Sequence, residues 1–203
     1  MSKQHPFTLL KKFRDLARFF IDEEVRSVAR RLFITNSVDA LLAYAGAVVG
    51  SYLSGNTDPM NYVAMGLGMA LAISMLSNFV AVFLVEEAER RIELKEISKH
   101  LLHSVDNTIL AKAPKLVALY VATWSAIGAL SFPALASTPF AASLATRIPI
   151  HMAVTASLCI VISILFALGT YLGKLIGRNP WGWGLRMALI GLAPLAIALI
   201  AKP

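Results

Sequence analysis

Asp39 is the residue whose type and position most directly suggest chemistry. It lies within residues 32–54, LFITNSVDALLAYAGAVVGSYLS, a stretch that carries no other charged residue. About 20 helical residues match a hydrocarbon core of roughly 30 Å, and a carboxylate at that depth costs about 2.5–3.5 kcal/mol. Intramembrane acids therefore usually face a pore, a partner or a proton path. We expect Asp39 to bind a cation or a proton. The alternative is an acid neutralised by protonation or by a hydrogen bond, with only a packing role.

The residues around Asp39 predict an oxygen-rich site beside a close helix contact. Thr35 and Asn36 precede Asp39 by four and three positions, so they share its helical face. Gly46 and Gly50 form a GxxxG pair within a row of small residues, a pattern that lets two membrane helices approach closely. We therefore expect Gly46 and Gly50 to lie at a helix–helix contact.

A second set of donor atoms lies in the apolar stretch 61–85, NYVAMGLGMALAISMLSNFVAVFLV. Met75, Ser74 and Asn78 provide the notable donors of its second half. A methionine in such a stretch is more often packing material than a ligand. From the residues alone, we therefore favour a packing role for Met75 over a role as a metal ligand.

The second stretch continues without a helix breaker into EEAERRIELKEISKHLLHSV, which predicts a cytoplasmic helical extension over 86–106. Four acids share one face of this extension and form an acidic stripe: Glu86, Glu89, Glu93 and Glu96. Such a stripe can concentrate cations at a pore mouth. The alternative is a solvated helix with ion pairs four residues apart, Glu86 to Arg90 and Glu87 to Arg91.

Composition and hydropathy place these residues in an integral membrane protein. The 203 residues are 57% hydrophobic and 15% charged, with a mean hydropathy of +0.67, whereas soluble domains average about 25% charged residues. The fold class that we expect is all-α, a polytopic membrane protein with five transmembrane helices. We expect residues 1–31 to form a cytoplasmic basic segment with an amphipathic helix over 7–31, and the membrane domain to cover 32–201. Its expected spans are 32–54, 61–85, 115–137, 150–172 and 185–201.

The distribution of basic residues predicts the orientation. Of 19 lysines and arginines, 17 lie on the side that holds the N-terminus, so the positive-inside rule places the N-terminus in the cytoplasm and the C-terminus outside or in a lumen. The same rule accounts for the basic charge without nucleic acid. Cys159 is the single cysteine, so an intramolecular disulfide is excluded. No cleavable signal peptide is evident, and the prokaryotic plasma membrane is the expected location.

Three segments of the chain resemble the vacuolar iron transporter family, in its short archaeal-type form. The first is RRLFITNSVDALLAYAGAVVGSYLSG, with its acid-centred motif. The second is GLGMALAISMLSNFVAVFLVEEAERR, where AISM precedes a Glu-rich helix, and the third is LGTYLGKLIGRNPWGWGLRMALIGLAPLAIALI. The resemblance covers about residues 28–201.

The resemblance implies a five-span homodimer that moves ferrous iron, and often manganese, out of the cytosol in exchange for protons. The family's path lies at the dimer interface and uses an acid on the first span and a methionine on the second. By position these correspond to Asp39 and Met75, and Gly46 and Gly50 become expected dimer contacts. The transported metal is the substrate; no cofactor is expected. Two-fold symmetry would double the donors that Asp39, Met75, Asn36 and Asn78 supply.

The sequence also departs from the family pattern. Ala40 replaces the usual glycine after the acid, and Leu67 stands where better-known members carry a second acid. The family's cytoplasmic metal-binding domain is reduced to about thirty residues. These departures support a second hypothesis, a non-transporting membrane scaffold of the same fold. An enzyme is not expected, because the apolar stretches contain no nucleophile–base pair and no metal-ligand motif such as HExxH.

Overall fold

The computed structural model describes residues 22–101 and 112–200, and all of its regular structure there is helical. One segment, η1, has the wider turns of a π-helix. The elements in order are α2 (Glu23–Leu53), α3 (Pro59–Leu71), η1 (Ala72–Ala81), α4 (Val82–Leu101), α5 (Ala113–Ala136), α6 (Thr138–Thr146), α7 (Ile150–Leu175), α8 (Pro180–Ile190) and α9 (Ala193–Ile200).

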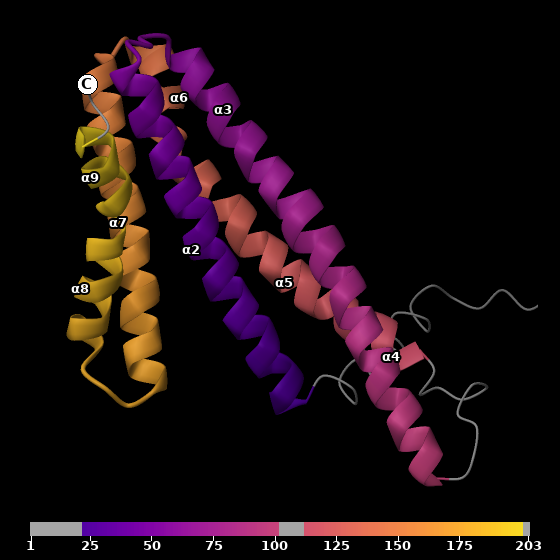
Figure 1. Cartoon of the computed structure of the whole chain (residues 1–203). Coiled ribbons are helices and arrows are strands. Elements are labelled where there is room, and N and C mark those ends of the chain that lie inside the picture. The colour runs from indigo at the N-terminus through magenta and orange to yellow at the C-terminus, as the bar shows by residue number, and fades with distance from the viewer. Residues whose placement is uncertain (1–21, 102–111, 201–203) are drawn as a thin grey trace, which may run out of the picture.

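Long helices run between the two ends of an elongated molecule (Figure 1). The segments α3, η1 and α4 form one continuous helix from Pro59 to Leu101. This helix and α2 meet at the loop that contains Gly55 and diverge toward the other end, and α5 packs against both. The helix α7 runs back beside α2, α8 packs along α7, and α9 packs against α2.

Four helices are long and apolar enough to cross a membrane. They are Glu23–Leu53, Pro59–Glu96, Ala113–Thr146 and Ile150–Leu175. We predict a fifth span over 185–201, but the structure has two short helices there in place of one long helix. This segment is divided between α8 and α9 by a turn at Gly191 and Leu192, just before Pro194, a residue that disrupts a helix interior.

The first helix begins earlier than the sequence suggested. We predicted a separate amphipathic helix that ends at residue 31. Instead α2 runs without a break from Glu23 through the apolar stretch, so residues 23–31 extend the helix that carries Asp39. The N-cap is Asp22, whose carboxylate accepts a hydrogen bond from the Val25 N–H at 2.9 Å and satisfies a free donor of the first turn. Residues 7–21 of the predicted helix lie outside the described part of the chain.

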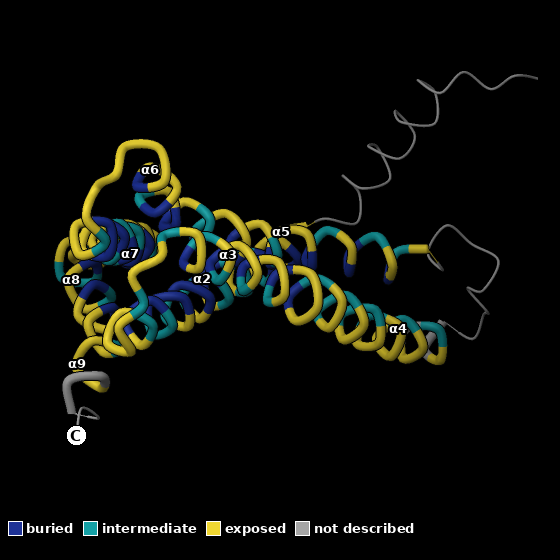
Figure 2. The backbone as a smooth tube through the Cα atoms, turned by 90° about the horizontal axis from the view of Figure 1, so that it is seen from above, coloured by how far each residue is buried: buried dark blue, intermediate teal, exposed yellow. Residues whose placement is uncertain are grey.

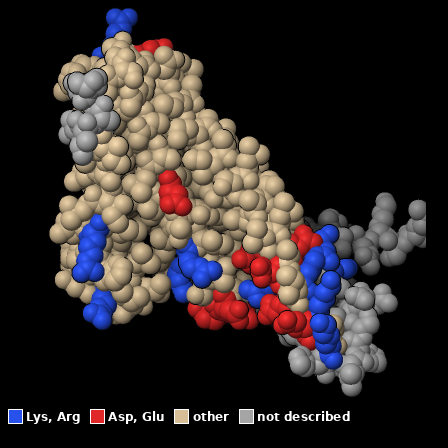
Figure 3. Space-filling view, viewed as in Figure 1, with Lys and Arg blue, Asp and Glu red and all other residues tan. Residues whose placement is uncertain are grey.

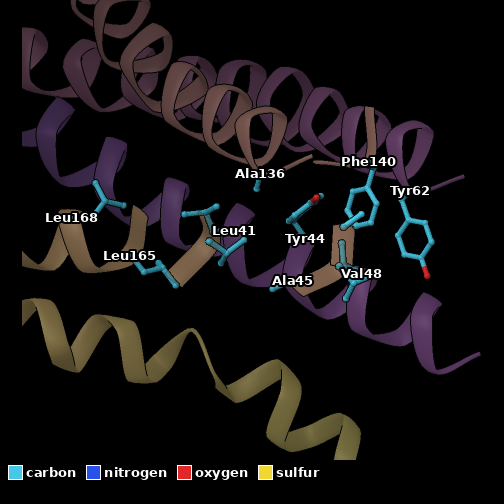
Figure 4. Close-up of a cluster of buried hydrophobic side chains, with 12 residues drawn as sticks. Leu41, Tyr44, Ala45, Val48, Tyr62, Ala136, Phe140, Leu165 and Leu168 are labelled. Atoms are coloured by element: carbon cyan, nitrogen blue, oxygen red, sulfur yellow. The ribbon is translucent and has the colours of Figure 1, made fainter. Parts of the chain in front are cut away.

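The core lies where α2, α3, α6 and α7 meet (Figures 2 and 4). Tyr44 is fully buried there, and its hydroxyl donates to Ser157 Oγ at 2.8 Å, while Ser157 donates to the Ala136 carbonyl at 2.7 Å. The rings of Tyr62 and Phe140 stack with centroids 4.6 Å apart. These two hydrogen bonds join α2, α7 and α5, and they give both buried hydroxyl groups a partner.

Close contact between α2 and α5 depends on a glycine. A Cβ built at Gly128 would overlap Ser37 Oγ and lie 2.9 Å from Phe33 Cε2. Gly128 therefore lets the two backbones approach more closely than a larger residue at this position would allow, which is the effect that small residues have in helix pairs of membrane proteins. The same pair of helices is joined by a hydrogen bond from Asn36 Nδ2 to Ser125 Oγ at 2.5 Å.

Charged side chains gather at the end of the molecule where α2 begins and α4 ends (Figure 3). The loop between α7 and α8 lies at this same end. Among the described lysines and arginines, Arg147 alone lies at the opposite end, in the loop after α6. The long apolar helices therefore separate one strongly charged end from one nearly uncharged end.

Replacing Gly128 by alanine tests the α2–α5 contact. We expect Gly128→Ala to lower the free energy of unfolding by about 1–3 kcal/mol, because the added methyl overpacks the contact. The matched control is Gly68→Ala, since nothing lies within 4 Å of a Cβ at that position. Thermal unfolding in detergent, followed by circular dichroism, measures both variants. An equal or higher Tm for Gly128→Ala than for Gly68→Ala would contradict the contact.

Candidate functional site

Asp39 lies on the outward face of α2. Its chain neighbours Ala40 and Leu41 are fully buried, whereas Asp39 itself is exposed. Thr35, one turn before it, and Ala43, one turn after it, are exposed as well. The structure therefore places the carboxylate on a stripe of small side chains that points away from the core, midway along an apolar helix.

The two glycines predicted as a dimer contact lie further along the same side of α2, but in different surroundings. A Cβ at Gly46 would lie 4.0 Å from Pro194 Cβ, so this position faces α9 of its own chain. A Cβ at Gly50 would meet nothing within 4 Å, and the residue is exposed. Within one chain, Gly46 is thus a contact between α2 and α9, and Gly50 is the one open to another molecule.

Met75 lies on η1, in the long helix that is least covered by the rest of the chain. In the most apolar part of that helix 17% of the residues are buried, against 39–44% in the other three long helices. Met75 is 51% exposed, beside other exposed apolar side chains such as Leu71 and Leu76. A large exposed apolar face of this kind marks contact with lipid or with another protein.

Asp39 and Met75 lie at a similar level of the molecule. Asp39 is fourteen residues before the end of α2, and Met75 is sixteen residues after the start of α3. With a rise of about 1.5 Å per residue, both are roughly 20–25 Å from the loop that joins the two helices. The two groups therefore lie on different arms of the divergent pair in Figure 1, at a comparable depth.

The two predicted amide donors do not share the exposed surface. Asn36 is half-buried and donates its Nδ2 hydrogen to Ser125 Oγ, so it links α2 to α5. Asn78 is 5% exposed and lies in η1, which packs on α5. Asp39 and Met75 thus face outward, while Asn36 and Asn78 face the interior.

Two buried polar groups of η1 have no hydrogen-bond partner among the described residues. They are Asn78 Nδ2 and Ser74 Oγ. A buried donor without a partner costs about 1–3 kcal/mol, and π-helical segments often coincide with functional sites. The sequence singled out both residues as donors but had no signal for their missing partners or for the π-helix.

The acidic stripe lies beside a pocket of about 360 Å³ between α2 and α4. Seven charged side chains line it: Glu24, Arg31, Glu86, Glu89, Arg90, Glu93 and Glu96. Arg90 pairs with Glu93 at 2.9 Å, with Glu24 at 3.8 Å and with Glu86 at 4.0 Å. Arg91 pairs with Glu87 at 2.7 Å. The structure therefore contains both ion pairs of the alternative interpretation, together with a pocket that keeps an excess of carboxylates.

In residues 22–101 and 112–200, no three histidine, cysteine, aspartate or glutamate side chains come close enough to hold a metal ion together. A metal site at Asp39 therefore needs ligands of other types, or ligands from a second copy of the chain.

One cluster was missed by the sequence reasoning. Two arginines of α2 meet aromatic side chains of α5 and α7 around a pocket of about 290 Å³. The spacing of Arg26 and Arg30, and of Tyr120 and Trp124, puts each pair on one helical face. The approach of Tyr171, from a helix far away in the sequence, left no signal in the sequence.

Comparison with known proteins identifies one distant relative. The chain is 28% identical to the uncharacterized protein MJ0645 of Methanocaldococcus jannaschii over 166 residues. This match covers 80% of this chain and 83% of the relative. No protein-family model matches the chain, and no solved structure matches it significantly. The similarity is therefore to an archaeal protein over most of its length, without a family assignment.

The contrast between the two asparagines can be tested by replacing each with leucine. Asn36→Leu should lower the free energy of unfolding by about 1 kcal/mol, because it removes the hydrogen bond between α2 and α5. Asn78→Leu should leave stability unchanged or raise it, because it removes a buried amide that lacks a partner. Thermal unfolding in detergent measures both. A loss for Asn78→Leu as large as that for Asn36→Leu would show that Asn78 has a stabilising partner.

Proposed function

We propose that this chain is a multi-pass membrane protein that moves a divalent transition metal, Fe²⁺ or Mn²⁺, out of the cytosol in exchange for protons. The path runs between two copies of the chain. The observation that carries the proposal is the position of Asp39, exposed on one protomer at the middle of an apolar helix. A carboxylate facing lipid at that depth is costly, and a second copy packed on this face would cover it.

The topology that we propose has five crossings. The four long helices supply four of them, and α8 followed by α9 supplies a broken fifth. Broken helices are tolerated in membranes where protein or a water-lined cavity satisfies the freed backbone groups. The charged end of the molecule faces the cytoplasm by the positive-inside rule, so the N-terminus is cytoplasmic and the C-terminus lies outside. The proposed location is the prokaryotic plasma membrane.

The donor atoms suit a borderline transition metal. Carboxylate and amide oxygens bind ferrous and manganous ions, and a thioether biases a site away from magnesium and calcium. Asp39 and Met75 lie at a comparable level on outward surfaces, so a two-fold axis between these surfaces would gather two copies of each. Asn36 already uses its amide nitrogen for Ser125, so its carbonyl oxygen is the atom available to an ion.

Proton exchange follows from the single carboxylate. A proton and a divalent cation compete for the same Asp39 oxygens, so binding one releases the other. At the cytoplasmic end, five glutamates and two arginines line the pocket between α2 and α4. Their net negative charge would raise the local concentration of divalent cations near the path. The resemblance of three segments to the vacuolar iron transporter family supports the same direction of transport.

A non-transporting scaffold is the second candidate. Two observations favour it: the described residues contain no group of three acidic, histidine or cysteine ligands, and Leu67 occupies the position of the family's second acid. A scaffold would use the exposed apolar face of α3 and η1 only to bind a partner. The two candidates differ in one measurable property, the movement of metal ions.

Metal flux into proteoliposomes with a trapped pH-sensitive dye tests the proposal. Wild-type protein should move iron(II) or manganese with a counterflow of protons, and should move magnesium and calcium more slowly. Asp39→Asn should abolish the metal-driven proton signal, because the amide cannot exchange a proton for a cation.

The matched control is Asp58→Asn. Asp58 is an exposed acid that caps α3 by accepting from the Met60 N–H at 2.9 Å, and asparagine caps a helix equally well. This variant should transport like wild type. No flux of any metal from folded, dimeric wild-type protein would overturn the transport proposal and favour the scaffold.

A further inference from the structure

A second pocket lies on the other side of the start of α2 from the acidic one. It has a volume of about 290 Å³ and is lined by Arg26, Ala29, Arg30, Phe33, Tyr120, Trp124 and Tyr171. Three helices build it: α2 supplies the arginines and Phe33, α5 supplies Tyr120 and Trp124, and α7 supplies Tyr171. The pocket thus occurs at the junction between the α2–α5 pair and α7.

The lining combines positive charge with an aromatic wall. Arg26 and Arg30 are one helical turn apart, so both guanidinium groups can reach one anion. No acid lines the pocket, and the only described ion pair of either arginine is a long one, from Arg30 to Glu23 at 4.0 Å. A phosphate oxygen pair matches the forked donors of arginine better than a monoatomic anion does.

The aromatic side chains of the lining contact one another and are partly exposed. The rings of Phe33 and Trp124 meet edge to face with centroids 6.1 Å apart, and those of Tyr120 and Trp124 with centroids 6.4 Å apart. Trp124 and Tyr171 are each nearly half exposed. Tryptophan and tyrosine with an open apolar side are typical of the level where headgroups meet acyl chains.

The size and position of the pocket favour a lipid over a soluble anion. The pocket of about 290 Å³ is much larger than a monoatomic anion requires. That is room for a phosphodiester and the first carbons of a lipid, whose tails would continue along the apolar helices. The pocket lies at the charged end of the molecule, where Lys174 and Arg178 follow Tyr171 along the chain. Basic pockets between membrane helices on the cytoplasmic side commonly bind anionic headgroups.

We infer that this pocket binds one anionic phospholipid, with its phosphate between Arg26 and Arg30 and its first acyl carbons against Phe33, Trp124 and Tyr171. The inference rests on the proposed membrane location but not on metal transport. A lipid in this position would join α7 to the α2–α5 pair at the cytoplasmic end.

Native mass spectrometry of the purified full chain, titrated with lipids of identical acyl chains, tests this site. We expect phosphatidylglycerol to bind at least about tenfold more tightly than phosphatidylcholine, with one tight site per chain. The double variant Arg26→Gln/Arg30→Gln should lose about tenfold or more in affinity for phosphatidylglycerol, because each arginine contributes to holding the headgroup. The double variant Arg26→Lys/Arg30→Lys should keep part of the affinity, since it retains charge without the forked geometry.

The matched control is Lys174→Gln/Arg178→Gln, which removes two positive charges at the same end without touching the pocket lining. It should bind phosphatidylglycerol within about twofold of wild type. An equal loss in this control would mean that surface charge alone attracts the lipid and would overturn the site. Displacement of the lipid by an equal concentration of inorganic phosphate would overturn it too, in favour of a soluble anion.

Quenching by brominated phosphatidylglycerol locates the lipid independently. In a Trp181→Phe/Trp183→Phe background, Trp124 is the remaining tryptophan. Its fluorescence should be quenched by brominated phosphatidylglycerol, and the Arg26→Gln/Arg30→Gln change should reduce that quenching. Equal quenching with and without the two arginines would place the bound lipid elsewhere.

Discussion

Asp39 places a carboxylate on the outward face of a helix that is otherwise apolar along its middle. In a bilayer, exposing that carboxylate to hydrocarbon would cost about 2.5–3.5 kcal/mol. One chain does not relieve this cost, because the core lies on the opposite side of α2. The same chain leaves the apolar face of α3 and η1 uncovered, at a comparable level. Association of two copies through these surfaces would bury both at once.

The inner side of α2 is fixed by close packing and by paired polar groups. Gly128 lets α5 approach Ser37, the Asn36–Ser125 hydrogen bond crosses the same contact, and Tyr44 reaches Ser157 of α7. These contacts hold the helix at a defined rotation, so Asp39 points outward rather than into the core. Near its N-terminus α2 separates a pocket rich in carboxylates from one lined by arginines and aromatic rings.

The helices follow from the sequence because hydropathy and helix caps are local properties. Length and apolar composition predicted the long helices, and the absence of a breaker after residue 85 predicted their extension toward α4. The turn at Gly191 depends on packing, and it divides the predicted fifth span into two helices. The start of α2 depends on capping by Asp22, so residues 23–31 belong to α2 and do not form a separate surface helix. Contacts between distant segments decide three other features: the buried side of α2, the π-helix at Met75, and the presence of Tyr171 in the same pocket as Arg26. Hydropathy does not encode such contacts.

The most direct measurement is the number of manganese ions bound per chain by purified protein of known oligomeric state, from the electron paramagnetic resonance signal of Mn²⁺. If two Asp39 carboxylates and two Met75 thioethers meet on a two-fold axis, a dimer should bind one tight Mn²⁺ per two chains, and Asp39→Asn should remove it. A monomeric protein, or tight binding that persists in Asp39→Asn, would contradict the account.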